Sequence, residues 1–221
     1  YTDFGLLTCN EAIGMDVSEV FKQLTGLGRA QALHHLWQAP FTLSANMMKA
    51  IEGEKRAAEA GRKGRIVAKM NSLLEPAIIE ALYAASQAGV EIDLIVRGVC
   101  ALRPGVPGLS ENIKVRSVIG RFLEHTRVFY FYADGAENVY LSSADWMERN
   151  FFRRIELAFP ILDARLKKRV ITEGLKLYLA DNEQSWDMDS NGVYTRRRHG
   201  RAKPHCAQQD MANLLGKTVK P

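Results

Sequence analysis

A histidine in this sequence lies where it could act on a phosphate. His125 occurs in FLEHTRVFYF, between Glu124 and Thr126 and two residues before Arg127, just ahead of a nearly unbroken apolar run. An imidazole changes its charge near neutral pH, so it can attack phosphorus or protonate a leaving oxygen. A lone histidine is more often a structural hydrogen-bonding group, and these residues alone leave both roles open.

Two further cations end predicted strands. Arg97 closes the run IDLIV and opens the loop GVCALRPGVPGLSEN, and its planar guanidinium would suit phosphate oxygens. The alternative for Arg97 is a salt bridge to Glu91 or Asp93 in the same strand. Lys69 ends the run RIVAKM and precedes a predicted helix N-terminus, which is a favourable place for an anion.

Small polar residues follow another predicted strand. Ser142 and Ser143 end it and Asn150 comes shortly afterwards, so the three could line an oxyanion pocket. No GxxxxGK[ST] motif is present, so any nucleotide site would be of another kind. The three cysteines are far apart with no CxxC pair, which argues against a zinc site or a disulfide framework and favours a reducing cytoplasm.

The elements that would position these residues alternate between strand and helix. A strand over 65–70, a helix over 75–89 and a strand over 90–99 predict a βαβ unit with a parallel strand pair. Further strands are predicted at 113–119, 127–132, 138–143 and 154–162, followed by an amphipathic helix over 163–180. The predicted class is α/β, with a mixed, largely parallel sheet flanked by helices. Such sheets bind ligands at the carboxyl ends of their strands.

The amino-terminal part of the chain predicts two helices. One covers 15–25, with Asp16 as its cap and Gly26 as its end; the other follows Ser44 as a plausible cap. We place a domain boundary between residues 36 and 37. Residues 1–36 are expected to be the remnant of a preceding domain, and residues 37–221 one α/β domain with a polar tail from about 181.

Composition is ordinary for a globular protein, with 47% hydrophobic and 25% charged residues. The net charge of +5 is mild, but TRRRHGRAK at 195–203 carries five cations and no acid, as a polyanion site or a solvated turn would. The longest apolar stretch contains Glu80 and is shorter than the ~20 residues needed to cross a bilayer. The first residue is not Met, so we expect part of a longer protein.

Five blocks in order carry a resemblance: YTDFGLLT, APFTLS, KMNSLLEP, the stretch from LIVRGV to HTRVFYF, and VYLSSADWMERNFFRRIELAFPI. They closely resemble the carboxyl-terminal third of bacterial polyphosphate kinase of the first class. The resemblance implies two phospholipase D-like catalytic domains, of which residues 1–36 would end the first and residues 37–221 would form the second. It also implies reversible transfer of the terminal phosphate of ATP to polyphosphate, through a phosphohistidine and with magnesium.

Carried over by motif, Tyr1 is similar to a tyrosine that contacts the nucleotide, and Arg97 to an arginine that grips its phosphates. His125 resembles the family's second active-site histidine, a general acid or phosphate ligand. Arg127 replaces the lysine of the family's His-x-Lys element, and Lys69 would add positive charge. The phosphorylated histidine and the magnesium ligands are expected upstream of Tyr1, so no metal ligand is expected here and this polypeptide alone is expected to be inactive.

The expected partners are ATP or ADP and inorganic polyphosphate, with no nucleic acid. The resemblance also implies a homo-oligomer for the full-length protein and a cytoplasmic location, with peripheral association at the inner membrane face left open. Two other functions stay open as well. One is a phospholipase D-like phosphodiesterase, which would need a second His-x-Lys. The other is a non-catalytic module that binds polyanions through residues 196–203.

Overall fold

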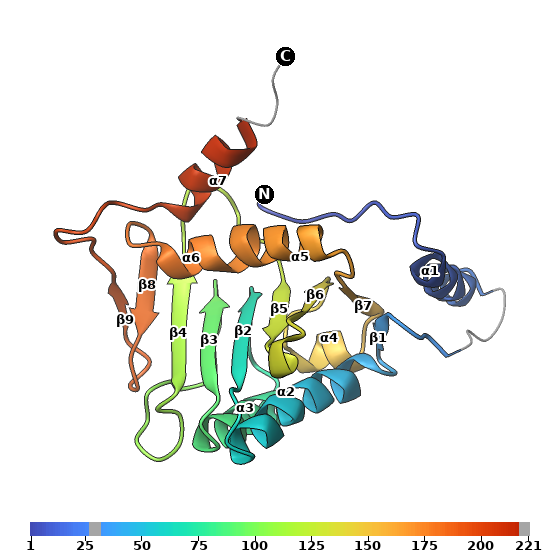
Figure 1. The fold of residues 1–221 in the computed structure, drawn as a ribbon, viewed down its shortest axis with the longest axis horizontal. Coiled ribbons are helices and arrows are strands. Elements are labelled where there is room, and N and C mark those ends of the chain that lie inside the picture. Colours follow the sequence, from blue (N-terminus) through green and yellow to red (C-terminus); the bar gives the residue numbers. More distant parts are fainter. Residues whose placement is uncertain (27–31, 217–221) are drawn as a thin grey trace.

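The computed structural model describes residues 1–26 and 32–216. Within these residues, nine strands form one sheet in the order β1-β7-β6-β5-β2-β3-β4-β8-β9, with helices on both faces (Figure 1). The α/β class with a mixed sheet flanked by helices is confirmed. The strands are β1 (Trp37–Ala39), β2 (Arg65–Met70), β3 (Glu91–Val96), β4 (Ile113–Val118), β5 (Val128–Phe131), β6 (Asn138–Ser142), β7 (Glu156–Pro160), β8 (Ser185–Met188) and β9 (Tyr194–Arg196).

Parallel pairing is confined to the middle of the sheet. β2 pairs in parallel with β3, and β3 with β4, as the βαβ unit predicted. Every other neighbouring pair of strands in the described residues is antiparallel. The prediction that the mixed sheet is largely parallel is therefore wrong, because most of its strand pairs are antiparallel. One reason is the connection from β5 to β6, which covers only residues 132–137 and is too short for a crossover between parallel strands.

Each face of the sheet has its own helices. The first is covered by α2 (Leu43–Glu59) and α3 (Pro76–Gln87), and the second by α5 (Ala164–Val170), the π-helical segment η2 (Ile171–Lys176) and α6 (Leu177–Ala180). Along β2 the side chains alternate, so Ile66 and Ala68 join the first core and Val67 joins the second. A strand buried on both faces reads as one apolar run, which is why RIVAKM shows no polar alternation.

The two amino-terminal helices begin at other residues than predicted. In α1 (Glu11–Leu24) the cap is Asn10, whose side chain accepts from the backbone N–H of Ile13. Asp16 lies inside the helix, where its carboxylate accepts from the backbone N–H groups of residues 34–36. α2 begins at Leu43 after Thr42, so Ser44 is not its cap. The end of α1 before Gly26, which has φ +71°, is confirmed.

The polar tail contains more structure than the sequence indicated. β8 pairs with the outer edge of β4 and β9 pairs with β8, both antiparallel. The tail also contains the helix α7 (Ala207–Gly216). Each tail strand is only three or four residues long and partly exposed, so its hydrophobic signal is weak.

The first residues of the chain pack against the main body. The backbone N–H of Thr2 donates to the carbonyl of Leu123 (2.9 Å), and the N–H of His125 donates to the carbonyl of Thr2 (3.2 Å). Farther along, α1 lies beyond the β1 edge of the sheet (Figure 1). The boundary at residues 36 and 37 stays a prediction. Among the helices of the described residues, none combines the length and apolar character that a membrane span requires.

Candidate active site

One edge of the sheet gathers the polar residues. The carboxyl ends of β2, β3, β4 and β6 point to the same edge as the amino ends of β5 and β7, because β5 and β7 run antiparallel to their neighbours. Asn71 directly follows β2, Arg97 directly follows β3, and Arg127 directly precedes β5. Asp145 comes shortly after β6, so residues far apart in sequence meet at this edge.

His125 is held by hydrogen bonds on both ring nitrogens. Its Nδ1 lies 2.7 Å from Oδ2 of Asp3, and its Nε2 lies 3.1 Å from Nη1 of Arg127. The tautomer that satisfies both neighbours has Nδ1–H donating to Asp3 and Nε2 accepting from Arg127. The ring of Tyr1 stands edge-on to the imidazole at 5.4 Å between centroids. The His125 side chain is 40% exposed, so it remains accessible to a ligand.

Arg127 is fixed in its plane. Its Nε and Nη2 donate to the two carboxylate oxygens of Asp145 at 3.2 and 3.0 Å. That carboxylate also accepts from the backbone N–H of Asn71 at 2.7 Å. In the orientation that its neighbours favour, the side-chain amide of Asn71 accepts from Arg127 Nη2 at 2.8 Å and donates to the carbonyl of Glu124. A paired fork of this kind loses little freedom when it binds, and Nη1 still faces His125.

Arg97 lies beside the same loop. Its Nη1 donates to the carbonyl oxygen of Glu124 at 2.9 Å, one peptide unit before His125. The alternative salt bridge within β3 is not formed by Asp93, whose carboxylate pairs with Arg65. Arg97 and His125 therefore share one edge of the molecule, as joint binding of an anion requires.

Lys69 lies behind the site and not in it. Its ammonium is 2.7 Å from Oε2 of Glu124, with side-chain exposures of 3% and 4%, and 4.3 Å above the ring of Tyr178. Burial lowers the pKa of Lys69, although the adjacent carboxylate of Glu124 acts in the opposite direction. Contact between Lys69 and a phosphate would require this buried pair to open.

A cavity of about 390 Å³ opens beside His125 and Arg127. Its wall includes Arg149, Arg154 and Glu156, which sequence reasoning missed because they lie around the short helix α4 (Glu148–Phe152) and carry no motif. Asp3 and Asp145 were also missed as functional residues. A useful signal for Asp145 was its place in the small-residue turn SSADW that follows a strand.

The predicted oxyanion residues line this cavity, but their hydroxyl and amide N–H groups donate to other protein groups. The hydroxyl of Ser142 donates to the carbonyl of Leu157 (2.8 Å), and that of Ser143 donates to the carboxylate of Glu156. The amide nitrogen of Asn150 donates to Glu156 at 2.7 Å. The amide oxygen of Asn150 is buried and has no hydrogen-bond partner among the described residues. These side chains shape the turn between β6 and β7.

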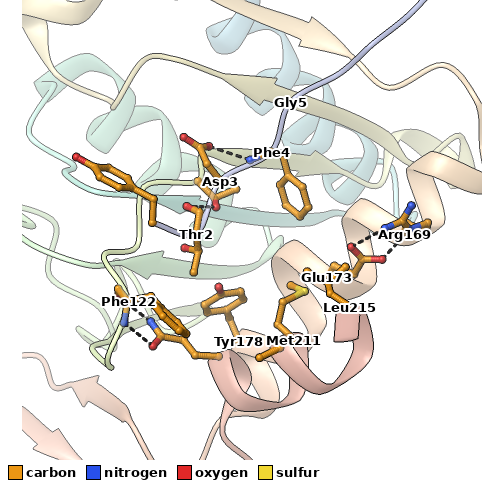
Figure 2. A pocket seen from close by; sticks show the side chains of 14 residues that line it. Thr2, Asp3, Phe4, Gly5, Phe122, Arg169, Glu173, Tyr178, Met211 and Leu215 are labelled. Carbon is orange, nitrogen blue, oxygen red and sulfur yellow. Dashed lines mark hydrogen bonds and ion pairs between the residues drawn. The ribbon is translucent and has the colours of Figure 1, made fainter. Parts of the chain in front are cut away.

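A second cavity, of about 460 Å³, lies on the other side of the amino-terminal segment. Figure 2 shows Phe4, Phe122, Tyr178, Met211 and Leu215 around it. Tyr1 also lines this cavity, whereas His125 and Arg127 line the first. Asp3, Phe4 and Thr126 contribute to both walls, so the segment that holds His125 separates the two spaces.

The basic cluster at 196–203 is remote from this site. β9 lies at the far edge of the sheet, beyond β3, β4 and β8 from β2. Arg196 donates to the carbonyl of Glu183, Arg197 lies 3.7 Å from the carboxylate of Asp187, and His199 lies 3.4 Å from that of Glu183. Part of the cluster's charge is therefore already balanced.

The described residues do not offer a fitted magnesium site. No group of three or more histidine, cysteine or carboxylate side chains in residues 1–26 and 32–216 is placed to hold a metal ion. Two carboxylates beside the His125–Arg127 pair are engaged, Asp3 by His125 and Asp145 by Arg127.

Comparison with known proteins identifies the family. Residues 36–209 match the family model described as polyphosphate kinase C-terminal domain 2. The chain belongs to the polyphosphate kinase family. A polyphosphate kinase from Burkholderia multivorans is 64% identical over 201 residues, which cover 91% of this chain and 29% of that protein. A second, from Paraburkholderia phytofirmans, is 61% identical over 217 residues, 98% of this chain and 31% of that protein.

Solved structures agree with the family. The crystal structure of polyphosphate kinase from Porphyromonas gingivalis superposes with a TM-score of 0.91 and 37% identity, over 96% of this chain and 32% of that one. The chain thus spans about a third of the polyphosphate kinases that it matches. The suspected resemblance to the carboxyl-terminal region of this family is confirmed.

Proposed function

We propose that the protein containing these residues reversibly transfers the terminal phosphate of ATP to polyphosphate, and that this chain supplies part of the phosphate-binding site. The observation that carries the proposal is the position of His125, held between Asp3 and Arg127 at the mouth of a polar cavity. The family of the chain supports the same chemistry.

In this proposal His125 does not form a bond to phosphorus. The covalent carrier is expected to be a histidine that precedes Tyr1 in sequence. Asp3 accepts the proton on Nδ1 of His125, so Nε2 is the nitrogen that would exchange a proton with a leaving phosphate oxygen. Asp3 thus acts on the transferred group through the ring, by orienting it.

Arg127 and Arg97 would neutralise charge on the phosphates. Phosphoryl transfer from an anhydride depends mostly on positioning and on charge stabilisation around the moving group. The Arg127 guanidinium is already oriented by Asp145, and a phosphate oxygen that enters between Arg127 and His125 could accept from both. Tyr1, which stands edge-on to the imidazole, would contact the nucleotide.

We assign Lys69 a positioning role in place of the predicted phosphate contact. Its charge is neutralised by Glu124, and the carbonyl of Glu124 in turn holds Arg97. ATP or ADP and polyphosphate as substrates, magnesium bound by other residues, a homo-oligomer and a cytoplasmic location, with peripheral membrane association as an alternative, belong to the same proposal.

The test is His125→Ala in the full-length protein, assayed for polyphosphate synthesis from ATP. General acid catalysis typically contributes about 10²–10⁴-fold, so kcat should fall by at least about 100-fold while the thermal midpoint stays close to native. His199→Ala is the matched control, because His199 lies in the remote basic cluster and is also exposed. Near-native synthesis by His125→Ala would remove His125 from the mechanism.

A further inference from the structure

The segment that leads into His125 is held from the side by α7. Residues 119–123 belong to no helix or strand. Gln208, in the first turn of α7, accepts from the backbone N–H of Phe122 (2.9 Å) and donates to the carbonyl of Phe122 (2.9 Å) and to Oε1 of Glu124 (2.6 Å). One side chain thus binds both backbone groups of Phe122 and the carboxylate next to His125.

The fit around the Gln208 amide is tight. Gln208 is 4% exposed, so its hydrogen bonds are made away from solvent. A Cβ atom added at Gly120 would overlap the amide oxygens of Gln184 and Gln208. A glycine at residue 120 therefore leaves the room that the Gln208 amide occupies.

α7 is itself fixed to the body of the domain. Oδ2 of Asp181, a residue with no exposed surface, accepts from the backbone N–H of Ala207 at 2.8 Å. The other carboxylate oxygen of Asp181 accepts from the N–H groups of Glu183 and Gln184. The first turn of α7 is therefore a firm support for Gln208.

The contact reaches the active-site loop through Glu124. Besides Gln208, the carboxylate of Glu124 accepts from Lys69 Nζ (2.7 Å), Thr2 Oγ1 (2.6 Å) and Tyr178 OH (3.1 Å). The carbonyl of Glu124 receives Arg97, and the next residue is His125. Figure 2 shows Thr2, Phe122 and Tyr178 together beside the second cavity, with the hydrogen bonds at Phe122 drawn.

We propose that Gln208 is a positioning residue for His125. By clamping Phe122 and the Glu124 carboxylate to α7, it sets where the imidazole stands relative to bound phosphate. Gln208 does not line the cavity beside Arg127 and contacts no reacting atom. Of these two cavities, it lines the second. The activity part of the test rests on the proposed function, whereas the exchange part does not.

The test is Gln208→Met, which keeps the length of the side chain and removes all three hydrogen bonds. In the 221-residue chain, we expect the amides of Phe122 and His125 to exchange at least about 10-fold faster with solvent deuterium, because their segment opens locally. In the full-length protein, kcat for polyphosphate synthesis should fall about 10-fold or more, with KM for ATP changed less than about threefold. Gln209→Met is the matched control, since Gln209 is exposed on the same helix turn and bonds only Asn213 in the described residues.

Unchanged exchange at Phe122 and His125 in a folded Gln208→Met chain overturns the proposal. If Gln208→Met does not fold, Gly120→Ala takes its place, because the added methyl group pushes the same amide away, and it must show the same faster exchange. Equal falls in activity for Gln208→Met and Gln209→Met also overturn it. If Gln208→Met shows faster exchange but His125→Ala is still active, the proposed function is wrong, whereas the inference that Gln208 positions the loop still holds.

Discussion

Glu124→Gln removes the charge that faces Lys69 inside the protein. The two side chains are 4% and 3% exposed and 2.7 Å apart, so the remaining ammonium would be left buried without a counter-charge. Breaking a buried pair in this way costs about 3–5 kcal/mol. Because glutamine also has only one acceptor oxygen for the remaining donors, we expect the free energy of unfolding to fall by about 4 kcal/mol.

Removing Lys69 and removing Glu124 should cost different amounts of stability. Lys69→Met leaves Glu124 with three neutral donors, from Thr2, Tyr178 and Gln208, so its charge remains hydrogen-bonded. We expect that variant to lose only about 1–3 kcal/mol. Without Glu124, the described residues leave Lys69 the ring of Tyr178 at 4.3 Å and the weaker influence of the Asp3 charge. The double variant should therefore be more stable than Glu124→Gln alone, because it buries no charge.

The loss of unfolding free energy caused by Glu124→Gln should also depend on pH. Burial lowers the pKa of Lys69 below its ordinary 10.5, and removal of Glu124 removes the main opposing influence. Between a lowered folded pKa and the unfolded pKa, the unfolded state binds more protons, so stability rises with pH. The deficit relative to the native protein should shrink as the pH is raised from about 7 towards about 10.

Urea unfolding of the 221-residue chain, followed by tryptophan fluorescence, to which the buried Trp146 contributes, measures these differences. Four proteins are compared: native, Glu124→Gln, Lys69→Met and the double variant. The reasoning is refuted if Glu124→Gln costs less than about 1 kcal/mol, far below the buried-pair range. A larger loss for Lys69→Met than for Glu124→Gln would refute it equally.

Three further outcomes are expected. Burial raises the pKa of Cys100 to about 11 from 9.0, so its thiol should alkylate about 100-fold more slowly at neutral pH than the exposed Cys9, measured by mass spectrometry. Burial raises the pKa of Asp16, but hydrogen bonds from three backbone N–H groups outweigh it and the pKa is lowered. The contribution of Asp16 to stability is complete above its unfolded pKa and is lost as the pH falls through its folded pKa. Asp16→Asn should therefore flatten the acid limb of a curve of stability against pH. Gly174→Ala would place a methyl carbon 2.9 Å from the ring of Phe4 and should lower the thermal midpoint by displacing the amino-terminal segment.

Local patterns predicted the central elements well. The βαβ unit from β2 to β3 was predicted because a buried apolar run, a helix with Pro76 in its first turn and a stop at Gly89 are all local signals. Arg97 and His125 were selected for the same kind of reason, since Arg97 directly follows an apolar run and His125 shortly precedes one. The resemblance to a family rested on ordered blocks of residues, which the sequence carries completely.

The contacts of those residues could not be predicted. Asp3 and His125 are 122 positions apart, and Lys69 and Glu124 are 55 apart. Nothing in the local pattern distinguishes Lys69, which pairs with a buried carboxylate, from a lysine that binds phosphate. The weak strands β8 and β9 were missed because they form on an edge that exists only once β4 is in place.

The sequence by itself determined the family, the α/β class and the central strands, and it made His125 the candidate for an active-site role. Only the tertiary structure decided that antiparallel strands flank a short parallel centre, that Asp3 and Arg127 contact the imidazole, and that Lys69 and Gln208 both donate to the carboxylate of Glu124. The physical reason is that propensity and hydrophobic period act over a few residues, whereas hydrogen bonds and buried charges are made between whichever groups the packed sheet brings together.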